Sequence, residues 1–556
     1  MMAPGSLLVQ PTRSVRAIAD VASDLGLPPS DLVPAGAGVL KVPVGLVRAL
    51  ADRPRKGRLI LVSAMTPTEH GEGKTVVAIG LGMALERLGY RSVVCLRQPS
   101  LGPVFGVKGG ASGGGRATVE PRPAIDLGLT GDLDAITNAQ NLVASLVDHH
   151  IFRGVAPEIV DGSTDLPRAS AIEDRSLRTI TAGLSQPNHG FPRAAQFVVS
   201  AACEVAAIHA LARDYVDLKE RFGRILVGRT PTGSPVRASD VGAAGSPASL
   251  LSNALAPNLV QTAEGTAAFV HGIPYANVAH GTCSRLAIEA GLALTDYCVV
   301  EAGFSSELGA EKFVDIVSAA TGLDANVGVI VATIRALRYH GGLPSNAPPS
   351  VEAVTRGLAN LDQHIANMRL LGLDPIVALN QFPTDTPEEV RVVEQFCRDR
   401  QALFAWDNAY STGGQGAEAL AQIVVGAAAR KQTSRALYGP MASIETVLDT
   451  VARKMYGADG VDLAPAAVAD LERIRAMGEA VGPVCIAKTP RSLSDDPHKW
   501  GRPTGFRVHV RRLERWSGAG FTVALLGGII TMPGLPEHPA AESIDITPDG
   551  RVVGVL

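Results

Sequence analysis

The chain has 556 residues, too many for one simple core, and a length that predicts about two to four compact units. Apolar residues make up 46% and charged residues 19%, a balance that is typical of globular proteins and excludes a disordered chain. The 51 basic and 54 acidic side chains nearly cancel, so the overall charge gives no support for nucleic acid or an anionic membrane as a partner. Any anion site must be local.

The six cysteines are scattered without a CxxC pair, which argues against a disulfide framework or a zinc site and favours a reducing compartment. The N-terminal stretch lacks the apolar core of a secretion signal. The most apolar late stretch, 521–530, has about half the length of a bilayer span. We therefore expect a cytoplasmic protein with no membrane span.

Short apolar runs alternate with helical stretches along the chain, the pattern of a parallel sheet covered by helices. The first run is followed by a predicted helix over 76–89. The runs predicted as strands are 58–66, 91–97, 295–304, 327–337, 375–382 and 402–407. Each ends in polar or small residues, at the sheet edge where open α/β proteins bind ligands.

Two further regions differ from this pattern. Longer helical segments, including 201–223, predict a mainly helical insertion at about 145–290, inside a P-loop nucleotide-binding core spanning 1–430. A helix at 443–457 and later apolar runs predict a C-terminal α+β domain at 431–556. The expected fold class is α/β: a P-loop NTPase-type, mostly parallel sheet flanked by helices, with a helical insertion and a smaller C-terminal α+β domain.

The strongest local signal is TPTEHGEGKT at 66–75, between the first predicted strand and its helix. Its glycines allow backbone N–H groups to converge on phosphate oxygens, Lys74 adds a positive charge, and the Thr75 hydroxyl can ligate Mg²⁺. The match to GxxxxGK[ST] is imperfect, because Thr68 occupies the first glycine position. The alternative is an ordinary strand-to-helix turn, but the flanking elements favour a phosphate-binding loop.

Arg97 ends the second predicted strand and opens a glycine-rich stretch that contains Lys108-Gly109-Gly110 and Gly113-Gly114-Gly115. A guanidinium at this edge can hold a carboxylate or an acyl phosphate through two hydrogen bonds, although a plain surface arginine is the alternative. Asp132, in Thr130-Gly131-Asp132, can work with Mg²⁺ or orient a nucleophile. Taken alone, it is more often a turn or helix-cap residue.

Glu301 follows four apolar residues of its predicted strand, the position of an acid that binds Mg²⁺ directly or through water. The alternative is a strand-end acid satisfied by backbone donors. Phe304, Phe382 and Trp406 each lie just beyond a predicted strand. Aromatic residues make up only 4% of the chain, so three at one edge predict a stacking slot for a flat ring system, although each alone is more often core. His280 and Ser284 are interpreted as core residues.

With these residues in place, the chain resembles formate–tetrahydrofolate ligase, also called formyltetrahydrofolate synthetase, over nearly its whole length. The matching blocks are TPTEHGEGKT, LRQPSLGPVFGVKGGASGGG, LTGD, LAPNLVQTAEGTAAFVHGIPYANVAHG, DYCVVEAGF, LGAEKF, VATIRAL, NQFPTDT, PVCIAKT, SLSDDP and TMPGLPEHPAA. The resemblance implies an ATP-dependent carbon–nitrogen ligase that joins formate to tetrahydrofolate through a formyl phosphate, giving 10-formyltetrahydrofolate, ADP and phosphate.

The resemblance also implies site residues and partners. Lys74, Arg97 and Asp132 would be catalytic, Thr75 and Glu301 would hold Mg²⁺, and Phe304, Phe382 and Trp406 would contact folate. The residues that would bind ATP are Thr68, Glu69, His70, Gly71, Glu72, Gly73, Lys74 and Thr75. The family is usually a homotetramer stimulated by a monovalent cation, so K⁺ or NH₄⁺ is an expected cofactor beside ATP and Mg²⁺, and a homo-oligomer is expected.

Some positions depart from the family pattern near the expected substrate site, and the phosphate loop carries Glu69-His70 where Pro-Ala is common. The other departures are Gln98, Gly128, His149, Thr282, Cys283, Ser305, Ser306 and Gly528. Two alternatives to the leading hypothesis follow. One is a ligase that activates another small acid or uses another amine, and the other is a P-loop switch protein that binds nucleotide without ligase turnover.

Overall fold

The computed structural model describes residues 15–53, 57–106, 112–160, 163–164, 166–184, 192–273 and 277–555. Within these residues the centre of the molecule is a twelve-stranded sheet in the order β1-β2-β13-β14-β4-β15-β3-β16-β17-β18, with β6 beside β13 and β5 beside β6. The seven strands from β14 to β18 in this order run parallel. The predicted α/β fold with a large, mostly parallel sheet is confirmed.

The strand bounds agree with the predicted runs to within a few residues. The parallel strands are β14 (Ala267–Val270), β4 (Ser92–Leu96), β15 (Tyr297–Glu301), β3 (Arg58–Ala64), β16 (Val327–Ala332), β17 (Pro375–Asn380) and β18 (Leu403–Asp407). The antiparallel ones are β1 (Val33–Pro34), β2 (Leu40–Lys41), β13 (Asn258–Thr262), β5 (Gly113–Gly114) and β6 (Ala117–Glu120). The predicted run 327–337 is a strand only in its first half, and α12 (Ile334–His340) follows.

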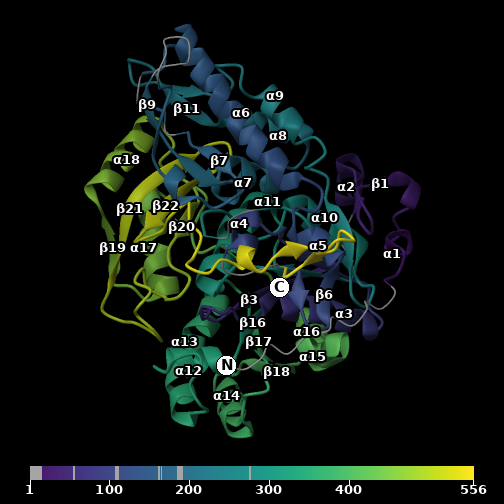
Figure 1. Cartoon of the computed structure of the whole chain (residues 1–556). Coiled ribbons are helices and arrows are strands. Elements are labelled where there is room, and N and C mark those ends of the chain that lie inside the picture. The colour runs from purple at the N-terminus through teal and green to yellow at the C-terminus, as the bar shows by residue number, and fades with distance from the viewer. Residues whose placement is uncertain are drawn as a thin grey trace.

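The strands read as continuous apolar runs because both faces of the sheet are covered. In β3, Leu59 and Leu61 belong to the larger core, whereas Ile60 and Val62 belong to the smaller core on the opposite face. The smaller core packs against α3 (Lys74–Arg87) and α16 (Glu418–Ala428). Helices of the other face include α10 (Arg285–Leu294), α12 and α13 (Val351–Leu370). The remaining helices beside this sheet are α1 (Ile18–Asp24), α2 (Val44–Ala51), α4 (Leu101–Phe105), α5 (Arg122–Asp126), α14 (Pro387–Asp399) and α15 (Ala409–Thr412) (Figure 1).

The region of the predicted insertion contains both helices and strands. Its helices are α6 (Asp132–Arg153), α7 (Glu204–Leu211), α8 (Tyr215–Arg224) and α9 (Gly245–Leu250). The predicted helical segment 201–223 is divided, because the Asp214 side chain accepts a hydrogen bond from the Asp217 N–H and so begins a new helix. The short strands are β7 (Arg168–Ser170), β8 (Ile180–Ala182), β9 (Arg193–Ala195), β10 (Phe197–Val199), β11 (Leu226–Arg229) and β12 (Pro235–Arg237), whereas β13 and β14 join the central sheet.

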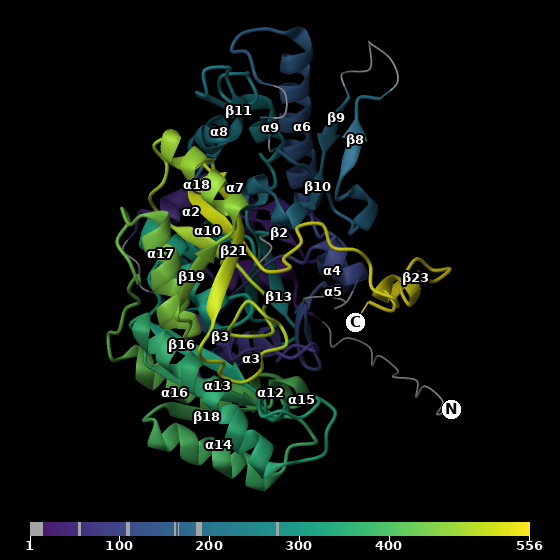
Figure 2. The same cartoon turned by 90° about the vertical axis from the view of Figure 1, so that its left-hand side faces the viewer.

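The last part of the chain forms a second, four-stranded sheet in the order β19-β21-β22-β20. These strands are β19 (Gly460–Leu463), β21 (Arg507–Trp516), β22 (Phe521–Leu526) and β20 (Val484–Ala487), accompanied by α17 (Ile444–Val451) and α18 (Pro465–Ala476). A terminal hairpin of β23 (Asp545–Ile546) and β24 (Val552–Val553) extends from the body, as does the β8–β9 pair (Figure 2).

The segment between β22 and β23 runs back to β10 and to the loop after α4. The Ala540 N–H donates to the Gly106 carbonyl just after α4 at 2.8 Å, and the Val199 N–H donates to the Thr531 carbonyl at 2.9 Å. Arg175 adds a hydrogen bond to the carbonyl of Leu535. Residues from the end of the chain therefore pack against the loop that follows Arg97.

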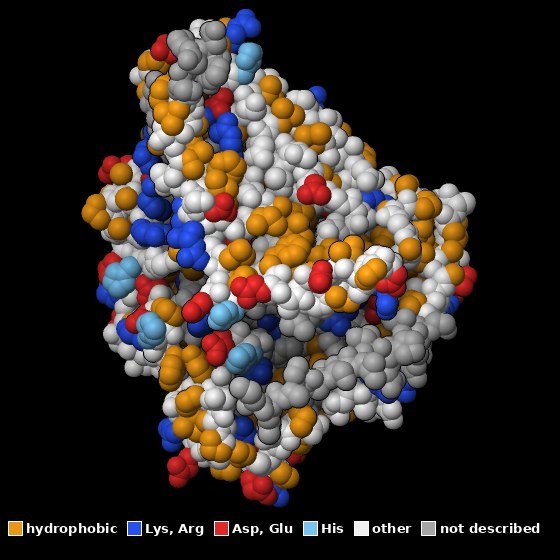
Figure 3. Space-filling view, in the orientation of Figure 1, with side chains coloured by type: hydrophobic (Ala, Val, Ile, Leu, Met, Phe, Trp, Pro, Cys, Tyr) orange, Lys and Arg blue, Asp and Glu red, His pale blue; other side chains and the backbone are white. Residues whose placement is uncertain are grey.

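The surface carries charges of both signs. In the view of Figure 3, acidic and basic side chains are interspersed over much of the face, and basic ones gather on the left, over the small sheet. The sheet's β21 contributes Arg507 and Arg511, both exposed. Among the described residues, no helix is long and apolar enough to cross a membrane.

Candidate active site

The carboxyl ends of the parallel strands bring most of the predicted residues to one edge. The phosphate loop follows β3, Arg97 follows β4, Phe304 follows β15 and Phe382 follows β17. Trp406 differs from the prediction, because it lies inside β18 rather than beyond it. Its register partner Leu379 lies next to the end of β17, so Trp406 is still near this edge.

The phosphate loop takes the backbone geometry that its glycines permit. Gly71 and Gly73 have φ values of 71° and 74°, a region that residues with a side chain rarely adopt. A Cβ on Gly73 would lie 2.4 Å from Nδ2 of Asn380, so a larger residue would have to displace the Asn380 side chain as well as adopt this backbone conformation. Gly73 caps α3, whose first residue is Lys74. The N–H groups at the start of the helix and the Lys74 charge together suit a phosphate group.

The Glu72 side chain holds the loop from the protein interior. Its side chain is fully buried. Oε1 accepts hydrogen bonds from the Thr68 N–H at 2.6 Å and from the Thr68 hydroxyl at 2.8 Å. Oε2 accepts one from the Thr333 hydroxyl at 2.5 Å. Glu72 therefore fixes the loop conformation, and its carboxylate is occupied by the protein itself.

The start of the loop is anchored by two buried histidines. The Thr66 N–H donates to Nε2 of His364 at 2.9 Å, and Nε2 of His340 lies 2.9 Å from the Thr66 carbonyl oxygen. Nδ1 of His364 lies 2.8 Å from the hydroxyl of Ser306. Burial lowers the pKa of each histidine to about 4, so both rings are neutral at pH 7. Sequence reasoning missed this pair, since no local pattern marks it.

Thr75, Glu301 and Arg97 come together from three elements. The Thr75 hydroxyl donates to Oε1 of Glu301 at 3.2 Å, and Nη2 of Arg97 lies 4.0 Å from the same oxygen. Glu301 is only 8% exposed, and Arg97 is about a quarter exposed. One carboxylate and one hydroxyl oxygen beside a phosphate loop fit Mg²⁺, which binds protein through one or two such groups and otherwise through water and phosphate oxygens.

Asp132 lies in a separate network of buried and partly buried side chains. Oδ1 accepts hydrogen bonds from Nζ of Lys41 and from the Thr130 hydroxyl, both at 3.0 Å, and Oδ2 accepts one from Nδ2 of Asn258 at 2.7 Å. Lys41 and Asp132 are each 1% exposed. Asp132 thus already has three protein donors. Lys41, which sequence reasoning did not single out, lies between apolar residues that give no sign of its partner.

The three predicted aromatics differ in their surroundings. Phe304 has a φ of 57°, an uncommon conformation for a residue with a side chain and one that is concentrated at functional sites. The guanidinium of Arg335 lies 4.7 Å from the centre of the Phe382 ring. Trp406 is 39% exposed and meets Phe404 edge to face, with ring centres 6.2 Å apart. Exposed or partly exposed aromatic faces at this edge suit a planar ligand.

Two departures from the family pattern contact each other. Nε2 of Gln98 donates to the Gly128 carbonyl at 3.3 Å. A Cβ on Gly128 would meet open space, although its φ of 112° disfavours a side chain.

Two other departures lie near Glu301 or in the core: the Thr282 hydroxyl donates to the Glu301 carbonyl at 3.2 Å, and Cys283 is buried. The predicted Lys108-Gly109-Gly110 lies outside the described residues.

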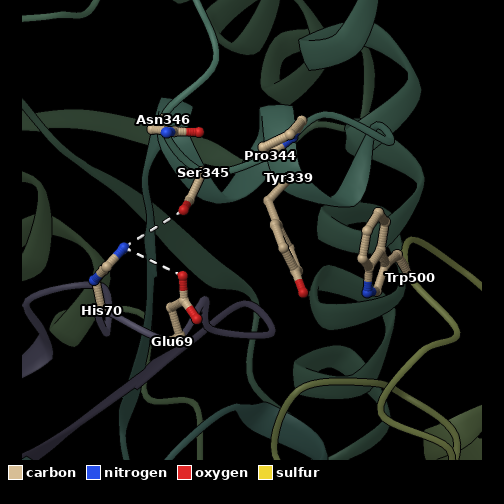
Figure 4. Close-up of a pocket in the computed structure, with 7 residues that line it drawn as sticks. All are labelled: Glu69, His70, Tyr339, Pro344, Ser345, Asn346 and Trp500. Atoms are coloured by element: carbon tan, nitrogen blue, oxygen red, sulfur yellow. Dashed lines mark hydrogen bonds and ion pairs between the residues drawn. The ribbon is translucent and has the colours of Figure 1, made fainter. Parts of the chain in front are cut away.

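A hollow of about 330 Å³ adjoins the phosphate loop (Figure 4). Glu69 and His70 line one side, with Nε2 of His70 3.4 Å from the Ser345 hydroxyl. Tyr339 and Trp500 line the other, with ring centres 4.8 Å apart. The Glu69-His70 pair, which departs from the common Pro-Ala, therefore faces this hollow.

The comparisons with known proteins agree with one another. A family model described as formate–tetrahydrofolate ligase matches residues 7–556. A formate–tetrahydrofolate ligase of Thermus thermophilus is 47% identical over 539 residues, which are 97% of this chain and 98% of that protein. One of Myxococcus xanthus is 46% identical over 550 residues, 98% and 99% of the two chains. One of Symbiobacterium thermophilum is 45% identical over 542 residues, 97% of each.

Proposed function

Because the chain belongs to the formate–tetrahydrofolate ligase family and is an ATP-dependent ligase, we propose that it forms 10-formyltetrahydrofolate through a formyl phosphate. A formate oxygen attacks the γ-phosphorus of ATP, the bond from that phosphorus to ADP breaks, and ADP leaves. The folate amine then attacks the formyl carbon. The carbon–oxygen bond to phosphate breaks, phosphate leaves with the electron pair, and the amine loses a proton.

The observation that carries this proposal is the convergence of Thr75, Glu301 and Arg97 beside the phosphate loop. The Thr75 hydroxyl lies 3.2 Å from a Glu301 oxygen, and Arg97 lies 4.0 Å from that oxygen. Lys74 and Arg97 would balance the charge of the transferring phosphoryl and formyl groups. Thr75 and Glu301 would hold Mg²⁺, which would neutralise charge on the phosphate oxygens when bound.

Folate would occupy the aromatic edge. Phe304, Phe382 and Trp406 would contact its pterin and benzoyl rings, with Trp406 offering a partly exposed ring. Asp132, whose oxygens are held by Lys41, Thr130 and Asn258, would support the reaction by fixing the start of α6. We further propose that K⁺ or NH₄⁺ stimulates the enzyme, that it forms a homotetramer and that it is cytoplasmic. Its domains would be a nucleotide-binding core at 1–430, interrupted by an insertion at about 145–290, and a C-terminal domain at 431–556.

The test is isotopic. Formate labelled with ¹⁸O should transfer label into inorganic phosphate in the presence of ATP, Mg²⁺ and tetrahydrofolate, because one formate oxygen becomes the bridging oxygen. Product formation without label in phosphate would contradict the formyl phosphate. No ADP release with formate, but release with another small acid, would favour a ligase of altered specificity.

A further inference from the structure

Arg335 contacts both the phosphate loop and an aromatic ring of the expected folate slot. Nη2 donates to the Gly71 carbonyl at 2.5 Å and lies 3.7 Å from Oε2 of Glu72. The face of the same guanidinium lies over the Phe382 ring, 4.7 Å from its centre. Arg335 is 22% exposed, so these contacts are shielded from water without being sealed from it.

Arg335 binds the carbonyl of the peptide group between Gly71 and Glu72, on the side opposite the N–H that would bind phosphate. The Gly71 carbonyl shares its peptide group with the N–H of Glu72, within the loop that would cradle phosphate. A cation bound at a carbonyl oxygen polarises the peptide and strengthens the hydrogen bond that its N–H donates. Arg335 thereby fixes both the position and the donor strength of the loop.

The helix that carries Arg335 is itself tied to the loop. Thr333 caps α12, accepting from the Ala336 N–H at 2.9 Å, and its hydroxyl donates to Glu72. On the other side, Nδ2 of Asn380 donates to the Glu72 carbonyl at 3.1 Å, and Phe382 follows two residues later. The loop, the start of α12 and the end of β17 therefore form one connected unit.

We propose that Arg335 is a positioning residue that couples the phosphate loop to the Phe382 ring, so that a change at the ring alters phosphate binding through Arg335. This inference rests on the proposed function for the identity of the ligands. A lysine cannot replace the residue, because it has the charge but lacks the planar face and the forked donors.

A double-mutant cycle with an inorganic ligand tests the coupling. The affinity of Mg²⁺-tripolyphosphate is measured for the full-length protein and for Arg335→Lys, Phe382→Leu and the double variant. Tripolyphosphate has no ring, so Phe382 cannot bind it by stacking. Phe382→Leu should weaken its binding about 3- to 30-fold in the parent and leave it nearly unchanged in the Arg335→Lys background.

Three outcomes are distinguishable. Effects of the two substitutions that multiply, or a Phe382→Leu variant with unchanged tripolyphosphate affinity, would overturn the coupling even if ligase turnover persists. Arg391→Lys, at an exposed ion pair on α14, serves as the matched control and should not alter the affinity. If the four affinities show the expected coupling but the parent protein releases no ADP with formate and tetrahydrofolate, the coupling stands and the proposed function is contradicted.

Discussion

Lys41 and Asp132 form a buried ion pair, with Nζ 3.0 Å from Oδ1 and both side chains 1% exposed. Burial lowers the pKa of Lys41, and Asp132 opposes this shift. Neither charge can therefore be removed alone without leaving the other in a medium that solvates it poorly. The pair joins β2 to the first turn of α6 and so fixes the segment that precedes Asp132.

Asp132→Asn or Lys41→Met should lower the free energy of unfolding by about 3–5 kcal/mol, because each leaves an uncompensated buried charge. The double variant should cost less than the sum of the single ones. Urea unfolding measures the free energy of unfolding of the single and double variants. Arg453→Met, which breaks an exposed pair with Asp449, is the control and should cost at most about 1 kcal/mol. Single variants as stable as the parent would contradict a stabilising role for the pair.

Lys74→Ala should lower kcat for ADP release by at least about 10²- to 10³-fold, because the charge that we propose stabilises the transferring phosphoryl group is lost. Thermal unfolding should change little, since Lys74 is only partly buried at the start of α3. Lys219→Ala, at an exposed position of α8, is the matched control. Equal turnover in the Lys74 and Lys219 variants would remove Lys74 from the site.

Trp406→Ala should raise the KM for tetrahydrofolate about 3- to 12-fold and leave the KM for formate unchanged, as expected for the loss of one stacking contact. The ring is 39% exposed, so the substitution should disturb the core little. Tyr215→Ala, another exposed aromatic, is the control. An unaltered folate KM would show that Trp406 lies outside the slot.

Asp407 gives a pH prediction. Burial raises the pKa of this carboxyl to about 7, so the folded protein holds a proton that the unfolded chain releases near pH 4. Its contribution to stability therefore falls as pH rises from about 4 to about 7. Asp407→Asn removes the titration and retains an oxygen for the Ala409 N–H, which lies 3.2 Å from Oδ1 of Asp407.

The Asp407→Asn variant should match the parent in urea stability near pH 4 and exceed it near pH 8, because only the parent must bury or neutralise a charge at the higher pH. Asp399→Asn, at an exposed helix end, should show no such difference. A constant gap between parent and Asp407→Asn across this range would mean that Asp407 ionises normally in the folded state.

The sequence predicted the central strands and the glycine-rich turn between β3 and α3 because their signals are local. A strand buried on both faces reads as an apolar run, and glycines with positive φ mark the loop before α3. The prediction that Trp406 lies beyond its strand was wrong, because β18 continues one residue past it to Asp407, as the predicted run 402–407 also does.

Side-chain partners distant in sequence could not be predicted in this way. Lys41 and Asp132 are 91 residues apart, and Thr333 is 261 residues from Glu72. Glu72 looks like a ligand residue within its motif, yet its carboxylate turns inward to hold Thr68 and Thr333. Arg335 did carry a usable signal, since it follows β16 at the same edge as the other site residues.

The return of residues 531–540 to the loop after Arg97 affects when the site can be completed during synthesis. The Gly106 carbonyl receives its hydrogen bond from Ala540, and Arg175 bonds to Leu535. Ribosomes extend a chain from its N-terminus, and early segments fold before later ones exist. The phosphate loop can form while the chain is still being made, but the Arg97 side gains these contacts only in the last stage of translation.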